Sequence, residues 1–396
     1  MIAAPLTDDL VLGAAELEQV ERGVRPHRLP RAVRQRDADP QLAMMEAQPS
    51  GVRIATRTTA VTMVVEVHTT RMTYRGVMRD RGAVDVVVDG SVHQSHVLSG
   101  GDTVEIDPTT GTSTVHPGTT ECITLTDLPA GEKTIEIWLP HNEQVDLVSL
   151  SADAVLHPAP TSGPRWLHHG SSISQGSNAA SPTRIWPVVA ARRAGVRLRN
   201  LGFGGSALVD PFMARVVRDS PADFISVKLG INVVNLDAMR LRSFVPAVHG
   251  FLDTVRDGHP TTPLLLVSPI HCAIHEHTPG PGALDPEAFA AGSVRFRATG
   301  TEGDTAFGRL TLRVIRDALA QIVESRSDDP NLHYLDGRVL FGEDDERRQP
   351  LPDSLHPDTD AHALMGQRFA NTVFGLSGPF APRTTTEDVP DRSSRG

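Results

Sequence analysis

Hydrophobic and polar residues alternate along the first part of the chain. Val61, Met63, Val65 and Val67 are separated mostly by polar residues, which is the pattern of strands buried on one face. Asp89-Gly90 lies between two such runs and predicts a hairpin, because a type I′ turn needs positive φ at both central positions. Strands are expected over 52–54, 61–67, 83–88, 91–97, 103–107, 122–125, 134–139 and 145–155. Many short strands separated by turn signals favour an antiparallel, jelly-roll-like β-sandwich.

Two segments before these strands follow other patterns. Residues 11–20 are expected to form a short helix, and the basic, Pro-bearing stretch 25–40 to be irregular. The Pro-rich segment 157–164 is typical of a linker.

After residue 165 the pattern becomes one of strand, loop and helix in repetition. Strands are expected over 166–167, 196–201, 224–229, 264–267 and 332–335. Helices are expected over 185–194, 212–218, 244–257, 310–325 and 362–374. This alternation predicts a three-layer α/β/α fold around a parallel five-stranded sheet, with ligands bound beyond the carboxyl ends of its strands.

Length and composition fit this division. A chain of 396 residues is long for one domain, and we expect domains over 1–160 and 165–378 followed by a disordered tail over 379–396. The net charge of −10 argues against nucleic acid or an anionic membrane as a partner. Cys122 and Cys272, the two cysteines, exclude a disulfide framework but leave a single disulfide open. Without a signal sequence or a long apolar stretch, a cytoplasmic protein is expected.

Polar, glycine-bearing motifs follow the strands of the second part. Each alone has an ordinary explanation: a loop, a tight turn, a turn asparagine, or a helix-start Asp beside a surface His. The motifs are, in order, Gly170-Ser171-Ser172, Gly202-Phe203-Gly204-Gly205-Ser206, Gly230-Ile231-Asn232 and Asp353-Ser354-Leu355-His356.

In this order the motifs resemble the blocks of the SGNH hydrolases, also called the GDSL esterase/lipase family. The resemblance covers roughly 165–375 and extends to a subgroup with an N-terminal β-sandwich; it implies a flavodoxin-like hydrolase domain. Two residues depart from the family pattern: Ser171 replaces the usual Asp of the first block, and Val233 replaces the Asp that often follows Asn232.

The resemblance also implies roles for individual residues. Ser172 matches the nucleophile, His356 the general base, and Asp353 the carboxylate that orients His356. The oxyanion hole is implied to consist of the backbone N–H groups of Ser172 and Gly205 with the side-chain amide of Asn232.

Three further residues are assigned by position. Ser171 is expected to cap a helix or line the loop rather than serve as nucleophile, and it is assigned with His271 and His275 to substrate binding. His271, His275 and His277 also admit a zinc site. Pro279-Gly280-Pro281-Gly282 follows and argues against the rigid helix that such a site needs. We expect instead a long loop over 273–308 that lines the substrate pocket or closes over it, and no metal or cofactor.

The sequence therefore predicts a serine esterase or deacylase that hydrolyses an acetyl or other short acyl ester, on a sugar or a secondary metabolite, through a Ser172 acyl-enzyme. An acyltransferase with the same triad is one alternative, and an inactive carbohydrate-binding or scaffold protein is another. The expected partner is a small-molecule ester, and a homo-oligomer remains open.

Overall fold

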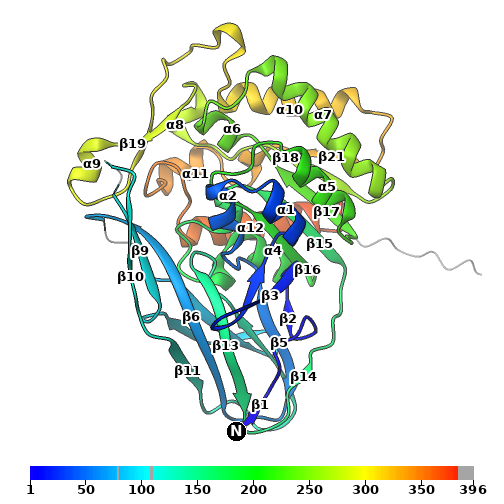
Figure 1. Cartoon of the computed structure of the whole chain (residues 1–396). Helices are drawn as coiled ribbons and strands as arrows, with labels where there is room; N and C mark the ends of the chain where they lie inside the picture. Colours follow the sequence, from blue (N-terminus) through cyan, green and yellow to red (C-terminus); the bar gives the residue numbers. More distant parts are fainter. Residues whose placement is uncertain (78–79, 108–109, 382–396) are drawn as a thin grey trace, which may run out of the picture.

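The computed structural model describes residues 1–77, 80–107 and 110–381. An N-terminal domain of two β-sheets lies below an α/β domain in Figure 1.

The first sheet of the N-terminal domain is mostly antiparallel, with a parallel pairing of β6 and β9. Its order is β10 (Ser113–His116), β9 (Asp102–Ile106), β6 (Met63–Tyr74), β13 (Gln144–Ala152), β4 (Gly23–His27) and β3 (Glu16–Val20), with β1 (Ile2–Ala3) beside β13 and β11 (Glu121–Leu125) beside β6. The second sheet has the order β14 (His157–Pro158), β5 (Arg53–Thr58), β12 (Lys133–Trp138), β7 (Ala83–Val88) and β8 (Ser91–Val97), with β2 (Val11–Leu12) beside β5.

Apolar residues from both sheets bury one another between them, as the alternation predicted. Ile54, Val65 and Ile135 are almost inaccessible to solvent and belong to one core cluster. The predicted hairpin is confirmed: β7 and β8 are joined by Asp89 and Gly90, with φ of 44° and 79°.

The expectations for the N-terminal segment were wrong. Residues 11–20 form β2 and β3 rather than a helix, and 25–40 is largely ordered as β4, α1 (Arg31–Arg36) and the start of α2 (Pro40–Glu46). Glu16 and Glu18 of β3 both form ion pairs with Arg34 of α1. These tertiary contacts are available to the charged residues of a strand and are not visible in the local pattern.

The α/β domain is built on a parallel five-stranded sheet, as predicted. Its order is β16 (Arg197–Gly202), β15 (Arg165–Gly170), β17 (Phe224–Lys228), β18 (Leu264–Val267) and β21 (Leu332–Leu335). Numbered along the chain this is 2-1-3-4-5, the flavodoxin-like arrangement, which brings ligand-binding loops to the carboxyl ends of the strands.

Helices cover both faces of this sheet (Figure 1). The principal helices are α4 (Trp186–Ala194), α5 (Pro211–Asp219), α7 (Leu241–Gly258), α10 (Leu312–Ser325) and α12 (Thr359–Val373). Successive side chains of β15 point to opposite faces: Trp166 stacks on Phe369 of α12, whereas His169 stacks on Phe251 of α7. Strand β15 is therefore buried on both sides.

Polar contacts join the two domains. The Asp85 carboxylate on β7 is 1% exposed and accepts hydrogen bonds from Ser181 Oγ at 2.6 Å, Thr183 N at 3.0 Å and Thr183 Oγ1 at 2.6 Å, all from the α/β domain. Its other oxygen accepts from Ser95 Oγ at 2.6 Å.

The last described residues belong to the fold, because Phe380 is buried and stacks on Phe224. Residues 379–381 thus do not belong to the expected tail, and the rest of that expectation, 382–396, lies outside the described residues. Within the described ranges, no helix combines the length and apolar character needed to cross a membrane.

Candidate active site

The first block forms a sharp strand-to-helix turn. Strand β15 ends at Gly170, Ser171 is the N-cap residue, and Ser172 is the first residue of the short helix α3 (Ser172–Gln175). Ser171 is completely buried, and its Oγ accepts a hydrogen bond from the N–H of Ile173 at 3.3 Å. Ser172 is partly exposed. The turn therefore buries one serine as a cap and presents the next to solvent.

Glycine is required where α3 meets β16. A Cβ on Gly202 would lie 2.5 Å from the backbone nitrogen of Gln175, a distance that no side chain tolerates. The two loops that carry Ser172 and Gly205 can approach each other only because this position has no side chain.

Ser172, His356 and Asp353 form a continuous chain of hydrogen bonds. Ser172 Oγ lies 2.8 Å from His356 Nε2, and His356 Nδ1 lies 2.7 Å from Asp353 Oδ2. With the proton on Nδ1, the imidazole donates to Asp353 and its Nε2 accepts from the Ser172 hydroxyl. This is the arrangement in which a histidine can take a proton from serine.

The turn from Asp353 to His356 is shaped by backbone contacts. Asp353 Oδ1 accepts from the N–H groups of Leu355 and His356 at 3.0 and 2.7 Å, and Ser354 has a left-handed φ of 65°. Burial by itself would raise the pKa of Asp353. The hydrogen bonds and positive charge of His356, with the Leu355 N–H, outweigh burial and lower this pKa from 3.8 to about 2.

Asn178 is a further side-chain donor to Asp353, and no sequence motif points to it. Its Nδ2 lies 3.2 Å from Asp353 Oδ2, the oxygen that also faces His356. It lies in the loop that follows α3 and has a left-handed φ of 67°. A polar residue in such a loop has no distinctive sequence pattern, so only the fold identifies this contact.

Gly205 and Asn232 follow β16 and β17, the strands that pair with β15 on its two sides. The Asn232 Oδ1 accepts from the N–H of Ala207 at 3.1 Å, which fixes the amide and leaves Nδ2 without a partner among the described residues. Gly205 has φ +71° and is partly exposed. The structure thus supplies donors at the strand ends where the sequence placed them.

The segment 273–308 contains short elements: α8 (Ala273–Glu276), the hairpin of β19 (Gly282–Leu284) with β20 (Phe296–Ala298), and α9 (Pro286–Ala290) between these strands. The Phe296 N–H donates to the carbonyl of Asp353 at 2.8 Å, and its ring meets the His356 ring edge-on at 5.7 Å. At the far end, Phe289 contacts Tyr74 of the N-terminal domain. The segment therefore spans from His356 to β6.

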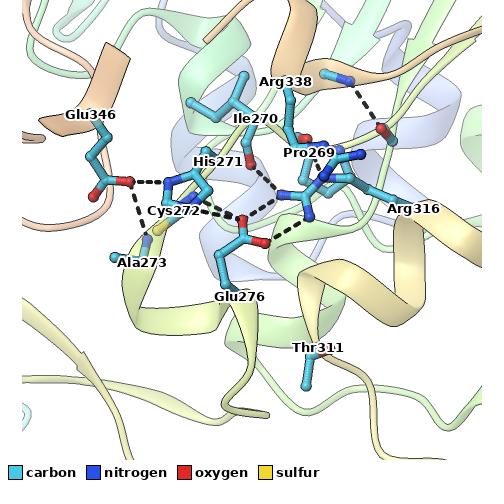
Figure 2. A network of polar contacts seen from close by, with 12 residues as sticks. Pro269, Ile270, His271, Cys272, Ala273, Glu276, Thr311, Arg316, Arg338 and Glu346 are labelled. Carbon is cyan, nitrogen blue, oxygen red and sulfur yellow. Dashed lines mark hydrogen bonds and ion pairs between the residues drawn. The ribbon is translucent and has the colours of Figure 1, made fainter. Parts of the chain in front are cut away.

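A buried polar network anchors this segment (Figure 2). Arg316 of α10 is 3% exposed; it donates to both carboxylate oxygens of Glu276 and to the carbonyls of Pro269 and Ile270. Glu346 binds His271 Nδ1 and the N–H of Ala273. These contacts fix the chain between β18 and α8.

Ser171, His271 and His275 therefore have structural partners, and we do not assign them to substrate binding. Ser171 is inaccessible, His271 pairs with Glu346, and the fully buried His275 contacts Asn235 and the carbonyl of Thr278. Among the described residues, no group of three or more His, Cys, Asp or Glu side chains is arranged to hold a metal ion.

Comparison with protein families divides the chain into two matched regions. The GDSL-like lipase/acylhydrolase family matches residues 169–364, and a domain described as the SsfX3 N-terminal domain matches residues 10–148. No curated protein matched the chain.

Solved structures similar to the chain span nearly its full length. The salicylyl-acyltransferase SsfX3 from a tetracycline biosynthetic pathway is 26% identical with a TM-score of 0.75, covering 92% of this chain and 94% of its own. A putative GDSL-like lipase from Bacteroides ovatus is 18% identical with a TM-score of 0.65, covering 91% and 93%. A family two carbohydrate esterase from Clostridium thermocellum is 15% identical with a TM-score of 0.53, covering 81% and 91%. The latter two likenesses show the fold alone.

Together with the flavodoxin-like sheet and the order of the motifs along it, these matches show that residues 169–364 belong to the GDSL-like lipase/acylhydrolase family and that an SsfX3-type N-terminal domain precedes them.

Proposed function

We propose that this protein is a serine acyl hydrolase that acts on a small carboxylic ester through a Ser172 acyl-enzyme. The observation that carries the proposal is the Ser172–His356–Asp353 hydrogen-bond chain, with distances of 2.8 and 2.7 Å.

The reaction follows from this geometry. Ser172 Oγ attacks the ester carbonyl carbon while its proton moves to His356 Nε2, and Asp353 stabilises the imidazolium through Nδ1–H. The carbonyl oxygen becomes an oxyanion that accepts from Ser172 N, Gly205 N and Asn232 Nδ2. His356 returns the proton to the departing alcohol, which leaves the acyl group on Ser172. Water then attacks the acyl-enzyme by the same route and releases the acid.

Substitution of the nucleophile tests the proposal. Ser172→Ala should abolish hydrolysis of p-nitrophenyl acetate and covalent labelling by a fluorophosphonate probe, while Ser171→Ala should still be labelled because Ser171 is buried. Full activity of Ser172→Ala would exclude Ser172 as nucleophile. An unlabelled parent protein would instead favour a carbohydrate-binding or scaffold protein with an inactive hydrolase domain.

Acyl transfer to an alcohol is the second candidate. It is favoured by the 26% identity, over 92% of this chain, to a protein described as a salicylyl-acyltransferase. The same triad serves both reactions, since the acceptor hydroxyl takes the place of water. Product analysis of the acyl-enzyme in the presence of a phenolic or sugar alcohol separates them: a new ester indicates transfer, and free acid alone indicates hydrolysis.

A further inference from the structure

The peptide group between Gly204 and Gly205 holds one of the proposed oxyanion donors. This peptide is trans, because the single cis bond among the described residues is Gly280–Pro281. In a trans peptide the C=O and the N–H point in opposite directions. Whatever holds the Gly204 carbonyl therefore also sets the direction of the Gly205 N–H.

The Gly204 carbonyl is held by a side chain of the N-terminal domain. Gln41 Nε2 donates to it at 3.0 Å, and Ser206 Oγ makes a longer contact at 3.3 Å. The Gln41 amide also lies 3.3 Å from where a Cβ on Gly205 would stand. Gln41 thus binds Gly204 and lies on the side of Gly205 where a side chain would stand.

The neighbouring peptides of this loop also have side-chain partners. Gly204 N donates to Gln175 Oε1 at 2.7 Å, and Gln175 in turn donates to the Gln48 side chain. Arg28, which is fully buried, donates to the Gly202 carbonyl at 2.6 Å and lies over the Phe203 ring. Residues of the 28–48 segment thus fix consecutive peptides that lead to the Gly205 N–H.

Gln41 contributes little to holding its own helix. It is exposed, whereas α2 is anchored by the buried Leu42 and by Asp39, which caps the helix at Leu42 N. The partly buried, neutral hydrogen bond of Gln41 is worth about 1 kcal/mol to stability, so its removal should leave the fold intact. A hydrogen bond to a carbonyl also polarises the attached N–H as a donor.

We propose that Gln41 is a positioning residue for the oxyanion hole: it fixes and polarises the Gly204–Gly205 peptide so that the Gly205 N–H faces the developing oxyanion. This rests on the proposed function. Because the oxyanion exists in the transition state and not in the bound ester, the effect of Gln41 falls on turnover rather than on substrate affinity.

The test uses Gln41→Met and Gln41→Glu, which keep the length of the side chain and remove the hydrogen-bond donor. Gln19→Met and Gln19→Glu are the matched controls. Gln19 is an exposed glutamine on β3 of the same domain. On p-nitrophenyl acetate, both Gln41 variants should lose about tenfold in kcat, less than loss of a whole oxyanion donor because Ser206 still contacts Gly204. KM should stay within about twofold, fluorophosphonate labelling should slow in parallel, and the melting temperature should fall by no more than about 2 °C. The Gln19 variants should match the parent.

Three results would overturn the inference: a kcat equal to that of the parent, a raised KM with kcat unchanged, or a loss of activity that follows a lowered melting temperature. Ser172→Ala, assayed in parallel, separates this inference from the function on which it rests. If Ser172→Ala is inactive while the Gln41 variants match the parent, positioning by Gln41 alone is wrong; if Ser172→Ala is active, the proposed function itself fails.

Discussion

At the scale of single residues, the doubled serine acquires a physical explanation. Ser171 is buried and caps α3, a role in which Ser and Asp are both favoured. Ser172, one residue further, is the one that meets His356. The structure therefore explains why the first block tolerates Ser171: capping needs an acceptor oxygen, and a hydroxyl supplies it without burying a charge.

Asp353 is proposed to orient His356 for proton transfer. Asp353→Asn should lower kcat by about ten-thousandfold, because an amide can donate to His356 Nδ1 and so favour the wrong tautomer. The comparison is made on p-nitrophenyl acetate, with Asp9→Asn, a change at an exposed carboxylate, as the control. Equal activity of Asp353→Asn and the parent would remove Asp353 from the mechanism.

The same residue predicts an acid-sensitive contribution to folding. Its folded-state pKa, about 2, lies below the ordinary 3.8, so the folded state favours the carboxylate. The contribution, about 2 kcal/mol by linkage, is complete above about pH 4 and is lost as the pH falls from 4 toward 2. Urea unfolding at pH 5 and pH 3 should show a steeper loss of stability in the parent than in Asp353→Asn; parallel losses would contradict the assigned pKa.

The motifs selected Ser172, Gly205, Asn232, Asp353 and His356 as candidates, because each follows a strand or precedes a helix in a fixed order, and the structure joins Ser172, His356 and Asp353 by hydrogen bonds. Asn178 and Gln41 were not predictable in this way. Each is a polar residue whose importance comes from a partner far along the chain, and periodicity carries no information about such pairs.

At the scale of elements, the parallel strands and long helices followed from their hydrophobic patterns, while short or charged elements did not. The hairpin of β19 and β20 has three residues in each strand, too few for an alternation to be recognised. Strand β3 carries Glu16 and Glu18, whose pairing with Arg34 is a tertiary contact that overrides local propensity.

The network around Arg316 is predicted to be the main anchor of the 273–308 segment. Arg316→Met should destabilise the protein by about 3–5 kcal/mol, because it leaves the Glu276 carboxylate buried without its partner. It should also lower activity, since the Cys272 thiol donates to the carbonyl of Ser354 in the Asp353–His356 turn. Urea unfolding and the esterase assay measure the two effects.

Arg347→Met is the matched control. Arg347 forms an ion pair with Asp344 at 2.6 Å, but its side chain is 66% exposed, and such pairs contribute about 0–1 kcal/mol. If both substitutions lowered the free energy of unfolding by a similar amount, the buried ion pair of Arg316 would contribute no more to stability than the exposed ion pair of Arg347.

At the scale of the whole molecule, the two-sheet domain and the α/β domain were both predicted, but the contacts between them were not. In sequence, Asp85 is one polar residue within an apolar strand. In the structure its carboxylate accepts hydrogen bonds from Ser181 and Thr183 of the other domain. A strand pattern defines which residues are buried, not which distant donors they meet.

Asp85→Ala should therefore destabilise the whole chain by about 3 kcal/mol or more, because buried hydroxyl and N–H donors lose an ionised acceptor. Thermal unfolding should show one transition shifted downward, whereas Asp9→Ala, at an exposed aspartate, should leave it unchanged. Two separate transitions, with only one displaced, would mean that the domains unfold independently and that Asp85 does not couple them.

Because residues 28–48 contact the Gly202–Gly205 loop, the two stretches of sequence should evolve together. The oxyanion loop of the α/β domain is held by residues of the N-terminal domain. Recombination that replaces the N-terminal domain with an unrelated one should therefore impair this loop. Substitutions at Arg28 or Gln41 should thus be accompanied across homologues by compensating changes near residues 202–206, a covariation between distant stretches of sequence. A chimera with a β-sandwich from another protein should be active only when it retains the segment from Arg28 to Gln48 of this chain.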